Sequence, residues 1–403
     1  MKRRALDVHD YSAGKYFSRL EELLGSDEIE SRLARIEHEI RVESGIYLRE
    51  WVIPKRAWWL GYRDARAIFH AGGSFRRAIT PIMERPLQTA VKLSILHSNM
   101  PERKRREFAS RILGDDILTP TLFEIDCAAH FHALGYDIEW FEVAENGVRS
   151  PEFIAKQDGV QIEVECKAKM ADSGRRVERA AFYRTVDELI PVISQKALCG
   201  AILLTFPRRF PTQPAWRSEA ARALEQQLAG GRTTISLSSG ERFECDLRPM
   251  DGSEVSAQAI ADQMAANANP YAHFAISGTP SRNAIRDPLI FRLESEKKDA
   301  FLQNVLDSLR TAEAQFTGTR AAIINCMIPE VDSFEGLQAD SAIQKMTYFF
   351  FDRYARPFVN AVSYVGEMKR EAQGMVILSD MPSLTFRNHK YDTAFGPEMP
   401  VYG

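Results

Sequence analysis

Residues 162–169, with the sequence IEVECKAK, alternate apolar and charged side chains with the period of two that a β-strand imposes. The charged face carries two acids followed by two lysines: Glu163, Glu165, Lys167 and Lys169. A carboxylate can hold a divalent cation, and a lysine two residues further on can orient or deprotonate an attacking water, as metal-assisted phosphodiester hydrolysis requires. A solvated strand edge that discourages aggregation shows the same alternation, so the strand alone does not decide between the two readings.

A hairpin is predicted immediately before this strand. Asp158-Gly159 separates two apolar-rich segments, and both residues tolerate the positive φ that tight hairpin turns need. The hairpin would bring Glu152, at the start of the first strand, towards the acidic face of the second. Two carboxylates about one strand spacing apart, with a lysine beside them, form a plausible Mg²⁺ pocket.

The segment 119–136 is predicted to form a helix that Thr119 or Thr121 caps and Gly135 ends. Glu124 lies in its first turn. Asp126 follows two positions later, so it points to another side of the helix, and we expect it at the surface.

Taken together, the early helical glutamate and the sequences LGYDIEW, SPEF and VECKAK resemble the PD-(D/E)xK, or restriction-endonuclease-like, nuclease superfamily. The resemblance covers residues 116–207. It implies an α/β fold with a mixed sheet and an α-β-β-β-α-β core. The implied strands are 137–143, 152–157 and 161–169, followed by a crossover helix over 179–197 and a buried strand over 201–206. The sequence departs from the superfamily motif where Pro151 is followed by Glu152 in place of aspartate.

Site roles follow from the resemblance, position by position. It implies that Glu152 and Glu165 are metal ligands, that the backbone carbonyl of Cys166 completes the inner shell, and that Lys167 is the catalytic lysine. Glu124 matches an auxiliary helix acid that some members use for a second metal or a metal-bound water. The implied cofactor is Mg²⁺ or Mn²⁺. Glu163 and Lys169 are either solvated flanks of this site or additional members of it.

Composition is that of an ordinary intracellular enzyme. The chain has 403 residues, 45% hydrophobic and 27% charged, with a net charge of −3. The charged N-terminus lacks the apolar stretch of a secretory signal, and no apolar run is long enough to cross a membrane. Five scattered cysteines without metal-ligand spacing predict buried thiols in a reducing cytoplasm rather than a zinc site.

Two local clusters of cations are candidates for contact with nucleic acid, since net charge alone does not favour it. Arg175, Arg176 and Arg179 follow the charged strand and are the preferred candidates. The second cluster is the run Arg103, Lys104, Arg105 and Arg106. Upstream, residues 55–63 mix cations with Trp58 and Trp59, which either stack on a nucleic-acid strand or belong to the core.

The chain divides by pattern into three regions. Residues 1–115 are predicted to be mostly helical, 116–210 to form the nuclease-like core, and 211–403 to form an α/β region of unknown role. The proline-rich stretch 207–214 is the expected boundary. Apolar spacing over 16–42 predicts a helical pair that can pack on the core or on a second copy of the chain.

The sequence thus favours a metal-dependent endonuclease that acts on DNA, in the bacterial defence or mobile-element settings typical of the superfamily. A nuclease for RNA or for particular nucleic-acid structures would use the same residues. A catalytically inactive binding or scaffold protein is the third reading, because glutamate replaces the motif aspartate at Glu152.

Overall fold

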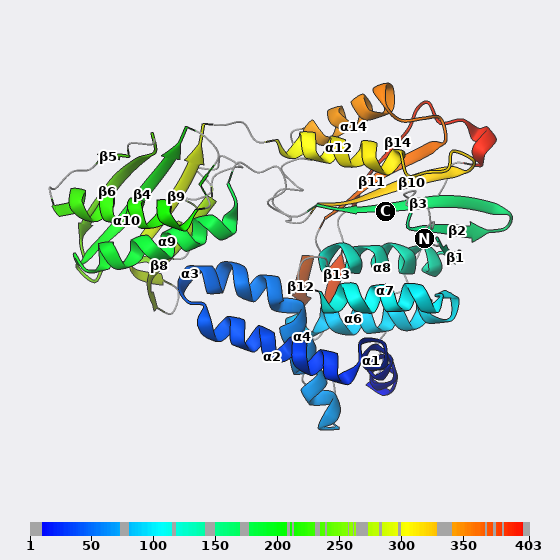
Figure 1. The fold of residues 1–403 in the computed structure, drawn as a ribbon, viewed down its shortest axis with the longest axis horizontal. Coiled ribbons are helices and arrows are strands. Elements are labelled where there is room, and N and C mark those ends of the chain that lie inside the picture. Colours follow the sequence, from blue (N-terminus) through cyan, green and yellow to red (C-terminus); the bar gives the residue numbers. More distant parts are fainter. Residues whose placement is uncertain are drawn as a thin grey trace. The chain divides into compact units, whose positions relative to one another are not determined.

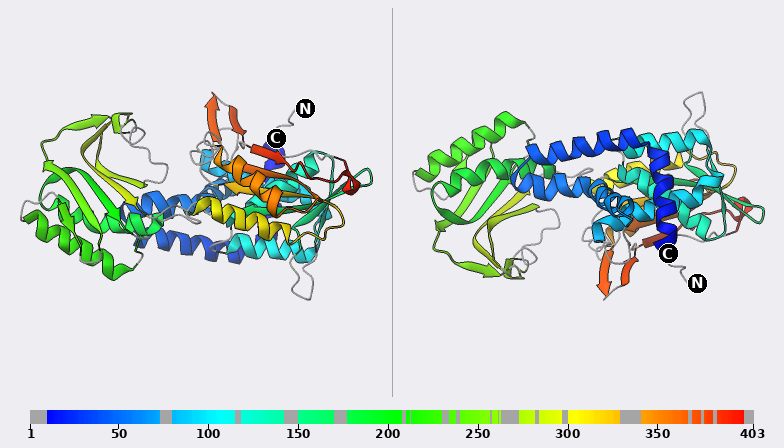
Figure 2. Two further views of the ribbon diagram at one scale, coloured as in Figure 1. Left: turned by 90° about the horizontal axis from the view of Figure 1, so that it is seen from above. Right: turned by 90° about the horizontal axis from the view of Figure 1, so that it is seen from below.

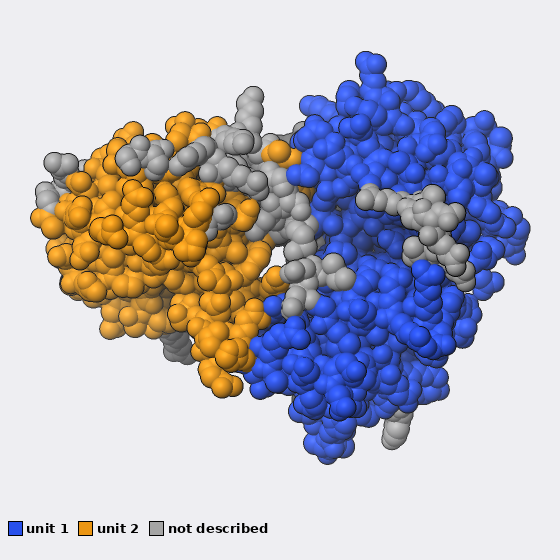
Figure 3. All heavy atoms as spheres, in the orientation of Figure 1, with its two compact units in different colours: residues 1–37, 56–171, 302–403 blue, residues 38–55, 172–301 orange. Residues whose placement is uncertain are grey.

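The computed structural model forms two compact units, which are coloured separately in Figure 3. The first contains residues 1–37, 56–171 and 302–403, and the second contains residues 38–55 and 172–301. The structure describes residues 10–72, 80–114, 118–141, 150–169, 177–207, 210–211, 213–229, 234–237, 240–256, 258–260, 262, 273–281, 284–296, 300–328, 341–366, 369–373, 376–380 and 383–397.

A six-stranded mixed sheet forms the centre of the first unit, with the strand order β1-β2-β3-β10-β11-β14. Its strands are β1 (Asp137–Trp140), β2 (Phe153–Gln157), β3 (Val160–Ala168), β10 (Ala321–Ile328), β11 (Val359–Gly366) and β14 (Ser383–Arg387). β1, β2 and β3 are antiparallel, β10 and β11 run parallel to β3, and β14 is antiparallel to β11. Every residue of β10 and β11 is buried, as central parallel strands covered on both faces require.

Helices cover both faces of this sheet (Figures 1 and 2). α8 (Leu118–Ala133) lies on one face, and α12 (Phe301–Glu313) and α14 (Ala342–Arg353) lie on the other. α12 connects the second unit to β10, and α14 connects β10 to β11. The predicted Asp158-Gly159 turn is confirmed, since both residues have positive φ and join β2 to β3.

The N-terminal region is helical, as the sequence predicted. Its elements are α1 (Asp10–Leu24), α2 (Ser26–Val42), α3 (Gly45–Tyr47), the π-helix η1 (Leu48–Val52), α4 (Ile53–His70), α6 (Pro81–Leu96), the 3-10 helix η2 (His97–Asn99) and α7 (Glu102–Leu113). Trp58 and Trp59 are buried, and Trp58 stacks on Tyr62 at 5.6 Å between ring centroids. They therefore belong to the core and are not available to stack on nucleic acid.

The second unit contains its own mixed sheet, with the order β5-β6-β4-β9-β7 and with β8 paired to β9. Its elements are α9 (Arg179–Ser194), β4 (Leu198–Phe206), α10 (Pro214–Ala229), β5 (Thr234–Ser236), β6 (Arg242–Pro249), β7 (Glu254–Ser256), β8 (His273–Ser281) and β9 (Ala284–Ser295). The boundary expected at 207–214 lies inside this unit, between β4 and α10. The units instead divide at residues 171/172 and 301/302.

The prediction that residues 179–197 and 201–206 supply the crossover helix and the last strand of the core is wrong. The helix and strand predicted over 179–197 and 201–206 exist, as α9 and β4, but β4 pairs with β6 and β9. The strand beside β3 is β10, which is parallel to it in a register that pairs Ile324 with Glu165. β10 is buried throughout, whereas burial alternates along β4, so the more apolar strand takes the central position.

Two expectations from composition have structural counterparts. All five cysteines are free and four of them are buried, which confirms the predicted buried thiols. Among the described residues, no helix combines the length and the apolar character that crossing a bilayer demands.

Asp126 was expected at the surface, and the structure shows that this is wrong. Its side chain is 4% exposed and accepts hydrogen bonds from Arg85 at 2.5 Å and Lys92 at 2.7 Å, both on α6. Burial alone would raise the pKa of this carboxyl, but the two cations outweigh burial and lower it. A buried ion triad therefore ties α8 to α6.

We predict that Asp126→Asn lowers the free energy of unfolding by about 3 kcal/mol at neutral pH, because two cations then lose their counter-ion. A carboxyl with a lowered folded pKa stabilises the fold above its unfolded pKa of about 4, so the difference should shrink as the pH falls below that value. Urea denaturation at several pH values measures the difference in the free energy of unfolding between the wild type and the variant. The matched control Asp137→Asn, at an exposed position of β1, should change stability by less than about 0.5 kcal/mol. Equal effects of the two substitutions would contradict the prediction.

Candidate functional site

β3 places Glu165 and Lys167 on one face of the sheet. Glu165 is fully buried, and the ammonium of Lys167 donates a hydrogen bond to its carboxylate. Lys167 also donates to the side-chain oxygen of Gln315, just beyond α12, at 2.5 Å. The amide nitrogen of Gln315 in turn donates to the carbonyl of Ser150 at 3.1 Å. Gln315 thus links the lysine of β3 to the segment that leads into β2.

Glu152 and Glu124 approach from β2 and α8. The backbone nitrogen of Glu152 donates to the carbonyl of Val164 at 3.0 Å, which holds Glu152 beside β3. Glu124 is 1% exposed. The ammonium of the buried Lys104, on α7, lies 2.7 Å from a carboxylate oxygen of Glu124 and 3.8 Å from one of Glu152.

Arg111, on the same face of α7 as Lys104, completes the surroundings of Glu124. Its guanidinium lies 2.7 Å from the second carboxylate oxygen of Glu124 and 3.0 Å from Glu107. Both oxygens of Glu124 are therefore engaged by cations, and a direct role as a metal ligand would require one of these ion pairs to open.

Carboxyl groups outnumber cations in this cluster. Four carboxylates (Glu107, Glu124, Glu152 and Glu165) share three cations (Lys104, Arg111 and Lys167). Burial, and then the charges of Glu124 and Glu165, raise the pKa of Glu152 well above its usual range. Burial also raises the pKa of Glu165, although Lys167 partly opposes it. The oxygen Oε2 of Glu165 has no hydrogen-bond partner in the part of the chain that the structure describes.

These features decide which residues could hold a metal ion. Within the described ranges, no three His, Cys, Asp or Glu residues are already grouped as a ligand set. Nevertheless, Glu152 and Glu165 offer hard oxygen donors in surroundings where carboxyl groups outnumber cations, and Oε2 of Glu165 has no hydrogen-bond partner among the described residues. This chemistry suits Mg²⁺ or Mn²⁺. The backbone carbonyl of Cys166 adjoins Glu165 in the chain and remains the third candidate donor.

Glu163 has a role that the sequence did not reveal. It was expected as a solvated flank or an additional site member, but its side chain is fully buried. It accepts hydrogen bonds from the backbone nitrogen of Thr317 at 2.8 Å, from the hydroxyl of the same residue, and from Arg320 at 3.1 Å. Glu163 therefore fastens the turn between α12 and β10 to β3. Lys169, at the other end of the charged face, is half-buried, and burial lowers the pKa of its ammonium.

The residues predicted to contact nucleic acid lie in different parts of the structure. Arg175 and Arg176 fall outside the described residues. Arg179 belongs to the second unit, where its guanidinium lies 5.8 Å from the ring centroid of Trp51. In the second run, Arg103 is exposed on α7 and Arg106 pairs with Glu102.

Lys104 and Arg105 of that run are both engaged by other side chains. Arg105 contacts His97 at 2.9 Å. The expectation that Lys104 contacts phosphate is wrong, because its ammonium is buried among the carboxylates. The spacing of Lys104, Phe108 and Arg111 at i, i+4 and i+7 could have revealed this, since it puts two cations on the apolar face of α7.

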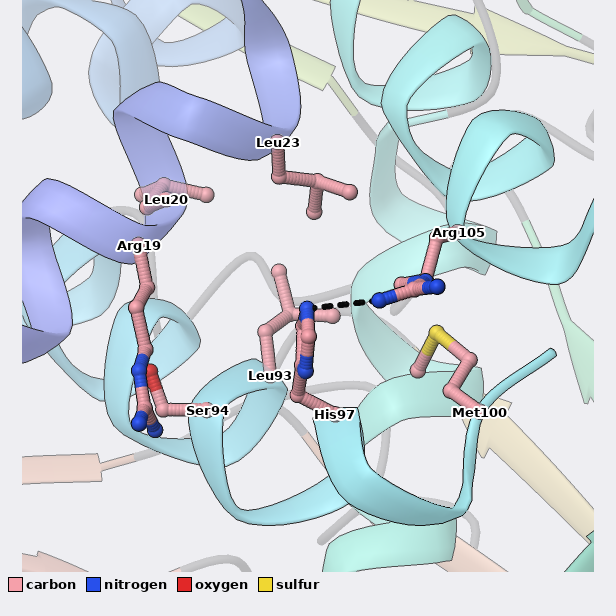
Figure 4. A pocket seen from close by; sticks show the side chains of 8 residues that line it. All are labelled: Arg19, Leu20, Leu23, Leu93, Ser94, His97, Met100 and Arg105. Atoms are coloured by element: carbon pink, nitrogen blue, oxygen red, sulfur yellow. Dashed lines mark hydrogen bonds between the residues drawn. The ribbon is translucent and has the colours of Figure 1, made fainter. Parts of the chain in front are cut away.

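Two pockets lie away from the cluster. A cavity of about 10 Å³ between α1, α6 and α7, shown in Figure 4, holds no more than one water. It is lined by Arg19, Leu20, Leu23, Leu93, Ser94, His97, Met100 and Arg105. A pocket of about 340 Å³ in the second unit contains Asp187, whose carboxylate accepts hydrogen bonds from the backbone of Ile46 and Tyr47. Asp187 thereby caps a helix start, which is a structural role.

We predict that Glu152→Gln stabilises the metal-free protein at alkaline pH. A carboxyl with a raised folded pKa favours the folded state at low pH, and this contribution is lost as the pH rises from about 4.5 through the folded pKa. Glutamine carries no charge at any pH, so the variant escapes the loss. Thermal unfolding in EDTA should show similar stability at about pH 5 and a more stable variant at about pH 8. A variant that is less stable than the wild type at alkaline pH would contradict the prediction.

Comparisons with known proteins give no match in protein-family models, in curated proteins or in solved structures. What this chain does must therefore be inferred from the chemistry of the carboxylate cluster and from the fold that assembles it.

Proposed function

We propose that this protein is a metal-dependent nuclease that hydrolyses phosphodiester bonds in DNA. The observation that carries the proposal is the cluster itself: Glu165 and Lys167 on β3 share one buried, carboxylate-rich site with Glu152 and Glu124. The order of elements supports it as well. With the second unit inserted between β3 and α12, the remaining order α8, β1, β2, β3, α12 and β10, in which β10 is parallel to β3, agrees with the α-β-β-β-α-β core that the PD-(D/E)xK resemblance implies.

Each residue has a distinct task in this proposal. Glu152 and Glu165 would hold the divalent cation, which when bound supplies charge neutralisation for the phosphate. Lys167 lies beside Glu165, where its ammonium can orient a water or neutralise a phosphate oxygen. Gln315 fixes the direction of Lys167 by accepting one of its hydrogen bonds. Glu124, paired with Lys104 and Arg111, sets the charge around Glu152.

We predict that Glu165→Gln and Lys167→Ala each reduce cleavage of supercoiled plasmid DNA by at least about a hundredfold, since each removes a group that acts on the reacting phosphate. EDTA should stop the wild-type reaction, and added Mg²⁺ or Mn²⁺ should restore it. Gel analysis of nicked and linear products measures the rate, and parallel incubation with single-stranded RNA separates DNA from RNA specificity.

The matched control is Glu163→Gln. Glu163 and Glu165 are both fully buried glutamates on the same face of β3, but the described hydrogen-bond donors to Glu163 are Thr317 and Arg320, which lie between α12 and β10. Its substitution should cost about 1–2 kcal/mol of stability and leave the cleavage rate of the folded protein unchanged. Cleavage that survives both Lys167→Ala and EDTA would exclude the proposed mechanism.

Lys104 favours a second candidate function, a non-catalytic nucleic-acid-binding or scaffold protein. Its ammonium lies between Glu124 and Glu152 and makes cation–π contacts with Phe108 at 4.8 Å and Trp140 at 5.4 Å. An internal lysine held in this way can neutralise two buried carboxylates without any metal ion. The two candidate functions predict different effects of replacing Lys104 on metal affinity and on stability.

For the nuclease, we predict that Lys104→Met raises the affinity for Mg²⁺ or Mn²⁺ by about tenfold or more. The substitution removes a positive charge that repels the incoming cation, while the methionine keeps the apolar contacts of the side chain. Isothermal titration calorimetry of both proteins measures the change. Loss of stability without metal binding by either protein would instead favour the scaffold function.

A further inference from the structure

We propose that the outer face of α14 binds single-stranded nucleic acid. This inference rests on the proposed function, because it assigns a binding surface to the same class of polymer. The surface, called the α14 patch, consists of Lys345, Tyr348, Phe349, Arg353 and Tyr354. These side chains are exposed, whereas Ile343, Thr347, Phe350 and Phe351 of the same helix are buried. Figure 1 shows α14 on the face of the sheet opposite α8.

Exposed aromatic rings are concentrated in this patch. Among the described residues, the large hydrophobic side chains that are exposed are Val42, Ile53, Met250, Tyr348, Phe349 and Tyr354. Half of these lie on α14 or directly after it, with exposures of 39%, 46% and 38% for Tyr348, Phe349 and Tyr354. The opposite side of α14 is already occupied by its own buried residues, among them Phe350 and Phe351. The exposed rings are therefore not needed to attach the helix to the core.

The rings are held in place from two sides. Tyr348 lies 6.0 Å from Phe386 between ring centroids, and Phe349 lies 5.8 Å from Tyr354. Arg310, on α12, stacks over Tyr354 at 4.6 Å. Arg310 covers one face of Tyr354, and Tyr348 also borders Phe351 at 6.3 Å and His389 at 6.1 Å. The surfaces left for a base are the exposed parts of Tyr348 and Phe349. Preorganised rings bind a base with little additional loss of entropy.

Two cations accompany the rings on this surface. Lys345 and Arg353 are exposed, and neither forms an ion pair with any described residue. Asp352 on the same face is already neutralised, since it lies 3.2 Å from both Lys390 and His389. The patch therefore presents positive charge that no described acidic residue pairs with, which suits a polyanion.

The mixture of rings and charges distinguishes between the polymers that could bind. The centre of a protein–protein interface is depleted of charged residues, whereas here Lys345 and Asp352 lie between Tyr348 and Phe349 on the helix surface. A duplex buries its base faces and offers nothing for Tyr348 and Phe349 to stack on. A single strand supplies both unstacked bases and phosphates, so it fits both components of the patch.

The test uses full-length Glu165→Gln protein in EDTA, so that cleavage does not interfere, and a fluorescein-labelled oligothymidylate. Fluorescence anisotropy should show that Tyr348→Ala with Phe349→Ala weakens binding by about tenfold or more. Tryptophan at both positions should restore it, because stacking needs an aromatic ring and not a particular one. Lys345→Ala with Arg353→Ala should lower the salt dependence of binding by about 0.7 for each phosphate that the variant no longer neutralises.

Control variants carry the same kinds of change elsewhere. Met250→Ala removes an exposed apolar side chain from the second unit, and Arg222→Ala removes a cation from α10. Both should leave the affinity unchanged. The inference is overturned if the double alanine variant of the rings binds like the parent protein, or if unlabelled duplex competes as well as single strand. It is also overturned if the ring variants only dissociate a self-associated chain, since α14 would then be an interface between copies.

The plasmid assay separates this inference from the proposed function. If binding depends on Tyr348 and Phe349 while the wild-type protein cleaves nothing, the α14 inference stands and the nuclease proposal fails. If Glu165→Gln abolishes cleavage while the α14 variants bind normally, the nuclease proposal stands and the α14 inference fails.

Discussion

The burial of two carboxylates on the central strand β3 is the constraint on which the first unit depends. Glu163 and Glu165 are fully buried in a sheet that helices cover on both faces. Transferring a charged carboxylate from water to such a place costs several kcal/mol unless cations or hydrogen-bond donors compensate it. The partners of Glu163 come from Thr317 and Arg320, far away in the sequence, whereas Glu165 pairs with Lys167 on the same strand.

The two glutamates are compensated differently, and the difference separates structure from function. Glu163 receives three hydrogen bonds from Thr317 and Arg320 and is fully satisfied. Glu165 receives one from Lys167 and keeps an oxygen without a partner among the described residues. A buried carboxylate whose oxygens all accept hydrogen bonds is typical of a structural residue. A buried carboxylate oxygen without a hydrogen-bond partner is energetically unfavourable, and a bound ligand can supply the missing interaction. This contrast, two residues apart on one strand, is the main physical reason to place the chemistry at Glu165.

Local pattern was sufficient to predict the β2–β3 hairpin, the helix that carries Glu124, and the alternation that puts Glu165 and Lys167 on one face. These features depend on neighbours in sequence. The partner of β3 could not be predicted, because several helix–strand pairs follow it, among them α9–β4, α12–β10 and α14–β11. Only the complete burial of Ala321–Ile328 in the sheet shows which one is adjacent.

The partners of the carboxylates were missed for a related reason. Lys104 lies in a run of cations that looks like a solvated surface, and only its position on the apolar side of α7 distinguishes it. The contact of Gln315 with Lys167 could not be predicted, because a single glutamine after a helix matches no sequence motif. Only the fold brings the two side chains together. Asp126 was misplaced because its cations, Arg85 and Lys92, lie on another helix.

The central claim is that Glu152 and Glu165 together hold one divalent cation. Its most direct test is a crystal structure of the wild-type protein with Mn²⁺, in which anomalous scattering locates the metal. We predict one anomalous peak with carboxylate oxygens of both Glu152 and Glu165 within about 2.0–2.6 Å, and Lys104 withdrawn from Glu152. A cluster without a peak, in which Lys104 still bridges Glu124 and Glu152 at millimolar Mn²⁺, would contradict the claim.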